Sequence, residues 1–168
     1  IKTHFGEDGN TAFINPLYIR KTEDYIRKKE AYPFIGDTNT LYSGRRKTGI
    51  THLDLAVEHG FSYASMNAPV VILDGLKSNN VKDIPVNLQH FKSVQLGGEF
   101  FSADGMIVIT HVKGHLIAGM GAAIKNLSMG LGSRTQKQRM HGDIKPEYVQ
   151  KKCIYCGLCA KVCYFNAI

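Results

Sequence analysis

The sequence has no cysteine before residue 153, and its four cysteines all lie between residues 153 and 163. Disulfides that stabilise a small fold usually join distant segments and close large loops. Pairs formed within this short stretch would close only very small loops. A disulfide framework is therefore excluded for the rest of the chain.

Long hydrophobic runs are also missing. No stretch approaches the roughly 20 consecutive apolar residues that a membrane-spanning helix needs. The chain has no start methionine and no charged leader, and it opens on Ile1 inside a predicted strand. We therefore predict a cytoplasmic protein with no membrane partner, and we expect that part of the natural polypeptide is missing at both ends.

Blocks of one charge sign are scarce, although the formal net charge is +7. Only residues 44–47 (GRRK) and 133–139 (SRTQKQR) are locally basic, and elsewhere the signs alternate. A strongly basic face would favour nucleic acid as a partner. This scattered pattern predicts mostly solvated surface and does not favour a nucleic-acid partner.

What the chain does have is a closely spaced cysteine run. Cys153, Cys156, Cys159 and Cys163 follow the pattern C-x2-C-x2-C-x3-C, which is typical of bacterial ferredoxins. Gly157 can supply the tight turn that such a loop requires. Zinc prefers two separated cysteine pairs or mixed Cys and His ligands, so zinc and structural thiols are the less favoured alternatives. The spacing predicts iron bound as a [4Fe–4S] cluster.

The fourth cysteine has a separate predicted role. In two-cluster ferredoxins the last cysteine of such a run ligates the other cluster. We therefore expect Cys153, Cys156 and Cys159 to hold one cluster and Cys163 to ligate a second. The intact protein would then carry two clusters, and these 168 residues alone would hold a cluster weakly or not at all.

Alternating strand and helix patterns before the cysteines predict an α/β fold. We expect a layered mixed or mostly parallel sheet with flanking helices, followed by a truncated ferredoxin-like Cys-rich tail. The predicted units are an α/β domain over 1–142, a linker over 143–150 and half of a ferredoxin-type domain over 151–168. Predicted helices start after Asn15 with Pro16, near Thr48 or Thr51, and at His115. Predicted strands cover 1–6, 32–39, 69–75, 91–98 and 105–114, the last one central, and Pro85 makes 81–87 an edge strand or a loop.

Polar residues follow several of the predicted strands. They are His4, Glu7 and Asp8 after the first, Asp74 after the third, and His111, Lys113 and His115 at the last. In open α/β sheets, ligands gather at the carboxyl ends of the strands. Together with Lys125 on the following helix, His111, Lys113 and His115 are the candidate catalytic or anion-binding residues. The competing interpretation is that the histidines are structural and that the glycines of GHLIAGMGAAIKN serve close packing.

The order of HFGE, ITHVKGH, GMGAAIKNLSMG, SRTQKQRMH and the cysteine run resembles a known prokaryotic family. These are the uncharacterised iron–sulfur centre proteins, a domain-of-unknown-function family with a ferredoxin-like tail. The resemblance implies a cluster role for the four cysteines, a preceding segment and a following second cysteine run. This sequence departs from the family pattern at Leu131, where the family commonly has cysteine, and at Tyr164, where the family usually has proline. The matching polar positions are His111, Lys113, His115, Lys125, Asn126, Arg134 and His141.

Three functions remain open at this point. The leading one is electron transfer between the ferredoxin-type tail and the α/β domain or a redox partner protein. The second is an enzyme for a small anionic ligand, in which Lys113 and Lys125 bind charge, His111 or His115 transfers protons, and the cluster is structural. The third is a nucleic-acid or protein binding module that uses residues 133–139. The sequence does not specify the oligomeric state.

Overall fold

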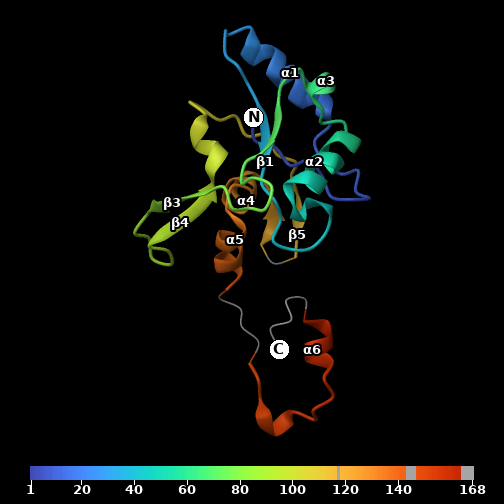
Figure 1. Cartoon of the computed structure of the whole chain (residues 1–168), viewed down its shortest axis with the longest axis vertical. Helices are drawn as coiled ribbons and strands as arrows, with labels where there is room; N and C mark the ends of the chain where they lie inside the picture. The colour runs from blue at the N-terminus through green and yellow to red at the C-terminus, as the bar shows by residue number, and fades with distance from the viewer. Residues whose placement is uncertain (117, 143–146, 164–168) are drawn as a thin grey trace.

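The computed structural model describes residues 1–116, 118–142 and 147–163, and its elements combine short helices with short strands (Figure 1). Their bounds are α1 Pro16–Arg27, β1 Ile35–Asp37, η1 Arg45–Lys47, α2 Gly49–Glu58, α3 Tyr63–Met66, β2 Val70–Ile72, β3 Val81–Pro85, β4 Ser93–Gly97, η2 Gly98–Ser102, β5 Lys113–His115, β6 Gly119–Gly121, α4 Ala123–Ser128, α5 Arg134–His141, η3 Gln150–Lys152 and α6 Leu158–Val162.

A small parallel layer forms the centre of the fold. Strands β1 and β2 pair in parallel, with Gly36 opposite Val71. Lys2 forms parallel bridges to Gly36 on one side and to Val108 on the other. The backbone order is therefore 107–109, 1–3, β1 and β2, and all four segments run in the same direction. Gly36 packs so closely on Leu73 that an added Cβ would lie 2.6 Å from its side chain.

Helices α1, α2 and α3 cover an apolar core next to this layer. The core consists of buried side chains from the layer, the helices and the loops between them: Phe5, Ile19, Ile35, Ala56, Phe61, Met66, Ala68 and Ile72. Asn15 caps α1 by accepting a hydrogen bond from the Leu17 amide, and Pro16 is its first residue. The predicted start of this helix is confirmed.

An antiparallel hairpin lies beside the layer. Strands β3 and β4 pair from Val81↔Gly97 to Pro85↔Ser93. Pro85 lies at the end of β3, so the prediction of an edge strand is confirmed and its cause is the missing amide donor. The other side of β4 bonds to the chain before α5, through Gly97 to Leu131 and Ser133 to Gln95. The α/β prediction thus holds in a coarse form, as mixed helices and strands, with three small two-stranded sheets in the part of the chain that the structure describes.

The predicted central strand 105–114 and the predicted helix from His115 are wrong. Within 105–114, Val108 bridges Lys2 at one side of the parallel layer, whereas Lys113 and Gly114 belong to the separate hairpin of β5 and β6. Gly119 has a φ of 71°, which a regular helix does not accept but a turn does. Leu116 is fully exposed, so the apolar stripe through it was misleading, and Ile117 lies outside the described residues. The helical part is only α4, and α5 follows it in the segment predicted to be solvated surface.

The buried faces of α1 and α2 contain polar as well as apolar side chains. On α1 the side chains of Tyr18 and Tyr25 are exposed, whereas Ile19 and Glu23 face the core. On α2 Ile50 and Val57 are exposed, whereas His52, Leu55 and Ala56 are buried. The buried face includes charged side chains because these form ion pairs inside the protein, as Glu23 does with Arg27.

The cysteine segment carries η3 and α6. Figure 1 shows α6 at the opposite end of the long axis of the molecule from α1. Tyr164 and residues 143–146 of the predicted linker lie outside the described residues, so the domain boundaries stay predictions. Among the helices that the structure describes, none is long and apolar enough to cross a membrane.

We predict that Phe61→Ala lowers the free energy of unfolding by about 3–5 kcal/mol, because it leaves a cavity in the core. Phe61 is fully buried and its ring lies 5.1 Å from that of Phe5. Urea unfolding followed by circular dichroism measures the loss. Val57→Ala, at an exposed position of α2, is the control, and we expect it to change stability by no more than about 0.5 kcal/mol. Equal losses in the two variants would contradict the assignment of the core.

Candidate functional site

Polar side chains gather where the parallel segments end. His4 follows segment 1–3, Thr38 and Asn39 follow β1, Asp74 follows β2, and Thr110 follows segment 107–109. Because these segments are parallel neighbours, their carboxyl ends meet at one edge of the layer. This is the edge at which open α/β sheets bind ligands. The sequence-based expectation that His4 and Asp74 lie near the same edge agrees with this arrangement.

Asp37, the last residue of β1, is the centre of the charged groups at this edge. It is 2% exposed. Its Oδ1 accepts hydrogen bonds from Lys2 Nζ and from the Thr38 amide, each at 2.9 Å, and its Oδ2 accepts one from Arg46 Nη2, also at 2.9 Å. Burial alone would raise the pKa of Asp37, but Lys2 and Arg46 hold this pKa well below its usual value. The carboxylate is therefore charged and satisfied on both oxygens.

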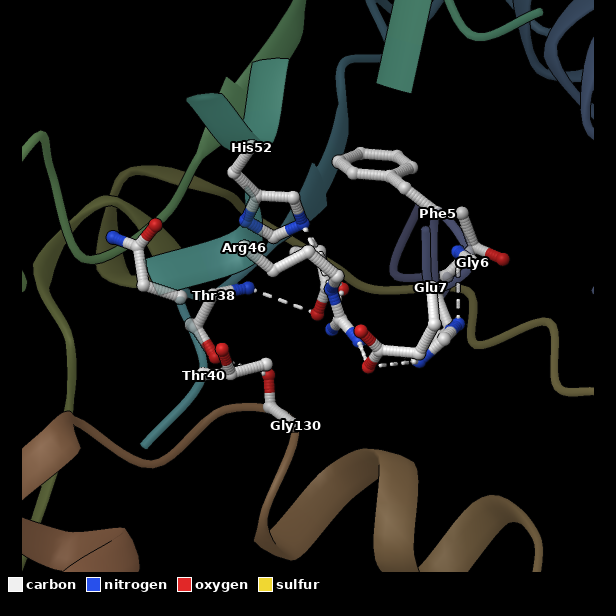
Figure 2. A network of polar contacts seen from close by, with 12 residues as sticks. Phe5, Gly6, Glu7, Thr38, Thr40, Arg46, His52 and Gly130 are labelled. Atoms are coloured by element: carbon white, nitrogen blue, oxygen red, sulfur yellow. Dashed lines mark hydrogen bonds and ion pairs between the residues drawn. The ribbon is translucent and has the colours of Figure 1, made fainter. Parts of the chain in front are cut away.

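Arg46, from η1, connects this carboxylate to the rim of the site. Figure 2 shows the Arg46 side chain running from beside His52 towards Glu7. Its Nε donates to His52 Nε2 at 3.2 Å, and its Nη1 donates to Glu7 Oε1 and lies 2.8 Å from His4 Nε2. Glu7 also accepts from the hydroxyl of Tyr42. In addition to Asp37, the guanidinium group of Arg46 therefore fixes the side chains of His52, Glu7 and His4.

Lys2 also contacts helix α4. Its Nζ donates to Asn126 Oδ1 at 2.5 Å and to the Thr3 carbonyl at 3.1 Å. The amide nitrogen of Asn126 donates to Thr110 Oγ1 at 2.9 Å. Helix α4 is therefore tied to two of the parallel segments through Asn126, and its position relative to the edge is fixed.

Lys137, from α5, completes the buried part. Its Nζ donates to Thr38 Oγ1 at 2.7 Å and to the Asn39 carbonyl. Asn39 in turn donates from its backbone and its side chain to Asp74 Oδ1, at 2.9 and 3.0 Å. Burial lowers the pKa of Lys137 to about 8, against the opposing effect of Asp37 and Asp74. Burial also raises the pKa of Asp74.

Some buried polar atoms at this edge have no hydrogen-bond partner among the described residues. They include Asp74 Oδ2, Asn39 Oδ1 and His52 Nδ1, and all three residues are fully buried. A buried polar atom without a partner costs about 1–3 kcal/mol. Ordered water is the usual partner for such groups when space permits.

The histidines of the network are neutral at pH 7. Burial is the largest cause of the low pKa of His4 and of His52, each lowered to about 3, and the Arg46 charge adds to both. The His4 side chain is 39% exposed, so solvent screens it, whereas His52 is fully buried. His4 is therefore a neutral imidazole that a ligand at the rim could reach.

The structure brings together three of the four candidate residues named from the sequence. Lys113 and His115 lie on β5, Lys125 lies on α4, and the Lys125 and Lys113 charges both lower the pKa of His115 after the larger effect of burial. His111 is half-buried, and no side-chain hydrogen bond or ion pair joins it to the others in the part of the chain that the structure describes. His111 is thus not placed in the group.

The most important buried residues were not predicted as site residues. Lys2, Asp37 and His52 were not singled out, and Lys137 was considered only within the basic segment 133–139 as a nucleic-acid contact. The basic stretches around Arg46 and Lys137 were predicted to be mostly solvated surface, although Arg46 is only 5% exposed and Lys137 only 6%. The prediction is wrong for these two side chains because both find partners inside the protein. Arg46 pairs with Asp37 and Glu7, and Lys137 donates to the Thr38 hydroxyl and the Asn39 carbonyl. Lys137 is therefore not available to a nucleic-acid surface. The one available signal was a charged residue inside or ending an apolar strand, as in IKTHF and FIGD.

The other residues matched by the resemblance have structural contacts. Arg134 donates to the Thr40 carbonyl at 3.4 Å and to the Lys47 carbonyl. Asp8, which was named only as a polar residue after the first predicted strand, lies 3.7 Å from Arg45. His141, at the end of α5, contributes to the low pKa of His115. Leu131 is 5% exposed and packs as an apolar residue.

The cysteines lie in an open loop and the short helix α6. None of the four forms a disulfide with a residue that the structure describes, and Cys156 and Cys159 are exposed. Tyr155 and Gly157 both adopt left-handed backbone angles, with φ of 56° and 70°, and the Tyr155 amide donates to Cys153 Sγ at 3.4 Å. Within residues 1–116, 118–142 and 147–163, no three His, Cys, Asp or Glu side chains converge closely enough to hold a metal ion.

A cavity of about 440 Å³ lies at the opposite edge of the layer. Its lining includes Ile1, Pro33, Phe34 and Ile107, which precede or begin the parallel segments. These are the amino ends of the strands, where the geometry of α/β sheets does not place ligand sites. The cavity therefore does not coincide with the charged edge.

The fold and the charged edge define the chain as an α/β protein with a buried ion-pair network at the carboxyl ends of its parallel segments. The chain belongs to the family described as "Domain of unknown function (DUF362)", which it matches over residues 1–165. Neither the curated proteins nor the solved structures contain a match to it.

We predict that Asp37→Asn lowers the free energy of unfolding by about 3–5 kcal/mol, because Lys2 and Arg46 then lose their shared buried counter-ion. Urea unfolding at pH 7 measures the change. Asp104→Asn is the matched control, since Asp104 is exposed, and we expect a change within about 0.5 kcal/mol. An Asp37 variant as stable as the control would show that the network does not hold the edge together.

We predict that His52 makes the folded protein less stable as the pH falls. Its pKa is about 3 in the folded protein and near 6.5 in the unfolded chain. Above pH 6.5 neither state is protonated at this residue. As the pH falls towards 3, the unfolded state binds a proton that the folded state does not. Protonation of His52 in the unfolded chain therefore lowers the free energy of unfolding by up to about 1.4 kcal/mol for each unit by which the pH falls.

His52→Gln keeps an acceptor for Arg46 but removes this titration. We expect the slope of unfolding free energy against pH, measured between pH 6 and 4, to decrease by about 1 kcal/mol per pH unit. His90→Gln replaces an exposed ring of the same type and should leave the slope unchanged. Parallel curves for the wild type and His52→Gln would rule out a neutral buried His52.

Proposed function

We propose that this protein is an iron–sulfur protein that binds a [4Fe–4S] cluster through Cys153, Cys156 and Cys159 and transfers single electrons. Cys163 is the proposed ligand of a second cluster. The observation that carries the proposal is the spacing C-x2-C-x2-C-x3-C of the four cysteines.

The backbone of the loop supports the same proposal. Left-handed angles at Tyr155 and Gly157 curl the chain between the cysteines, as a loop around a cuboidal cluster requires. The Tyr155 amide already points at a cysteine sulfur, and amide donors to cluster sulfurs are one of the factors that set the reduction potential. The side chains would still have to turn inwards, since no metal-binding group of three is formed by the described residues.

The side chains around the loop suggest how the cluster would be reached. Ile154, Tyr155, Leu158 and Val162 are apolar or aromatic and strongly exposed. An apolar shell of this kind would limit solvent access to the cluster, and exposed apolar groups also suit transient contact with a redox partner protein or with the α/β domain. The bound cluster would supply one-electron redox chemistry, and the chain would supply its ligands and its surroundings.

We expect the complete gene product, purified without oxygen, to contain iron and acid-labile sulfide in equal amounts. It should also show a paramagnetic signal that depends on reduction by dithionite. Cys156→Ser should remove the cluster held by the first three cysteines, because a ligand is lost. Cys163→Ser should leave that cluster in place and alter only the second. Iron, sulfide and electron paramagnetic resonance measurements on both variants test this assignment.

Two results would overturn the proposal. One is zinc, or no metal at all, in anaerobically purified protein. The other is a cluster that dithionite does not reduce, which would remove the electron-transfer role while leaving a structural one.

A further inference from the structure

Lys113 and Lys125 differ from the other basic residues at the carboxyl edge. Lys2 and Arg46 contact the Asp37 carboxylate, and Arg46 also contacts Glu7. In contrast, neither Lys113 nor Lys125 forms an ion pair or a side-chain hydrogen bond with any residue that the structure describes. The inner cations are thus neutralised, and these two outer ones are not.

The fold holds the two lysines in defined places. Lys113 on β5 pairs with Gly121 on β6, and its side chain runs along Gly121, where an added Cβ would lie 3.6 Å from Lys113 Cγ. Lys125 directly precedes Asn126, whose contacts with Lys2 and Thr110 anchor α4. The absence of a side chain at Gly121 leaves room for the lysine stem.

The lysine charges act on one another and on two histidines. The pKa of Lys125 is lowered, by burial first and then by the Lys113 charge. The Lys113 charge is also one of the causes that lower the pKa of His4 and of His115. Basic groups from segment 1–6, β5 and α4 therefore lie within electrostatic range of one another.

Two carboxylates at this edge, those of Asp37 and Glu7, are already engaged by other groups. Asp37 is buried between Lys2 and Arg46, and Glu7 is held by Arg46 and Tyr42. The two lysines have no counter-ion among the described residues, so together they supply a local charge of up to about +2 at pH 7. A phosphate monoester has a charge of nearly −2 at this pH, so it matches this excess, whereas a single carboxylate matches only half of it.

We propose that Lys113, Lys125 and His115 form a binding site for the phosphate group of a small molecule, at the carboxyl edge of the parallel layer. The lysines supply the charge, and His115, which is not itself needed as a cation, lies beside the ligand as a polar group. The neutral imidazole of His4 is at the same rim. This site is independent of the cysteines and of the proposed electron transfer.

Inorganic phosphate is the probe for this site. We expect isothermal titration calorimetry at low salt to show saturable binding of phosphate to the full chain. Lys113→Gln and Lys125→Gln should each weaken this binding about tenfold, since a charge-assisted hydrogen bond is lost. Lys77→Gln removes an equal charge at an exposed position that follows β2, and it should leave the affinity within about twofold.

Amide chemical shifts of the wild type give a second measurement that does not depend on the folding of any variant. Phosphate should shift the amides of Lys113, Gly114 and Gly121 with the same apparent affinity. Absence of saturable binding would overturn the proposal, as would equal weakening by Lys77→Gln or shifts elsewhere only. Acetate binding more tightly than phosphate would overturn the assignment to phosphate.

Discussion

The fold depends on the neutralisation of one buried carboxylate. Asp37 ends β1 inside the protein, where an unpaired charge would be strongly destabilising. Lys2 from the neighbouring segment and Arg46 from η1 supply the two counter-charges, each at 2.9 Å. Because these partners are distant in sequence, the requirement to pair Asp37 brings the first residues, β1 and η1 to one point. His52, Glu7, His4 and Asn126 are then positioned through Arg46 and Lys2.

This arrangement separates two kinds of cation at the same edge. Inside, each positive charge has a carboxylate or several oxygen acceptors, so Lys2, Arg46 and Lys137 act as fixed structural charges. Outside, on β5 and α4, the lysines have no such partners among the described residues. The inner group sets the geometry, and the outer group is where a ligand could gain charge pairing. The cysteine segment is a distinct feature that depends on neither group.

Sequence patterns predicted the local features with strong signals. Asn15–Pro16 marked the start of α1, Pro85 marked an edge strand, and the aliphatic run before Asp74 marked a parallel strand. The prediction of a helix from His115 was wrong up to Gly121, because glycines and aliphatic residues there fit a helical stripe although the chain forms a hairpin, and only α4 is helical. Apolar periodicity cannot distinguish these when the residues end up exposed, as Leu116 and Met120 do.

The site was only partly predictable for a different reason. His4, Asp74, Lys113, His115 and Lys125 were recognisable as polar residues at strand ends, and the structure places them at or near one edge. Lys2, Asp37, Arg46 and Lys137 were not, because composition treats a charged residue as surface until its partner is known. Their partners lie up to 124 residues away along the chain, so only the tertiary structure could reveal them.

The most direct test of this account is the ionisation of Asp37 in the folded protein. The ¹³C chemical shift of the Asp37 carboxyl carbon should stay constant from pH 7 down to about 3.5, because Lys2 and Arg46 hold its pKa far below the usual value of about 3.9. A titration of Asp37 with a midpoint near or above this usual value, while the protein remains folded, would contradict the account.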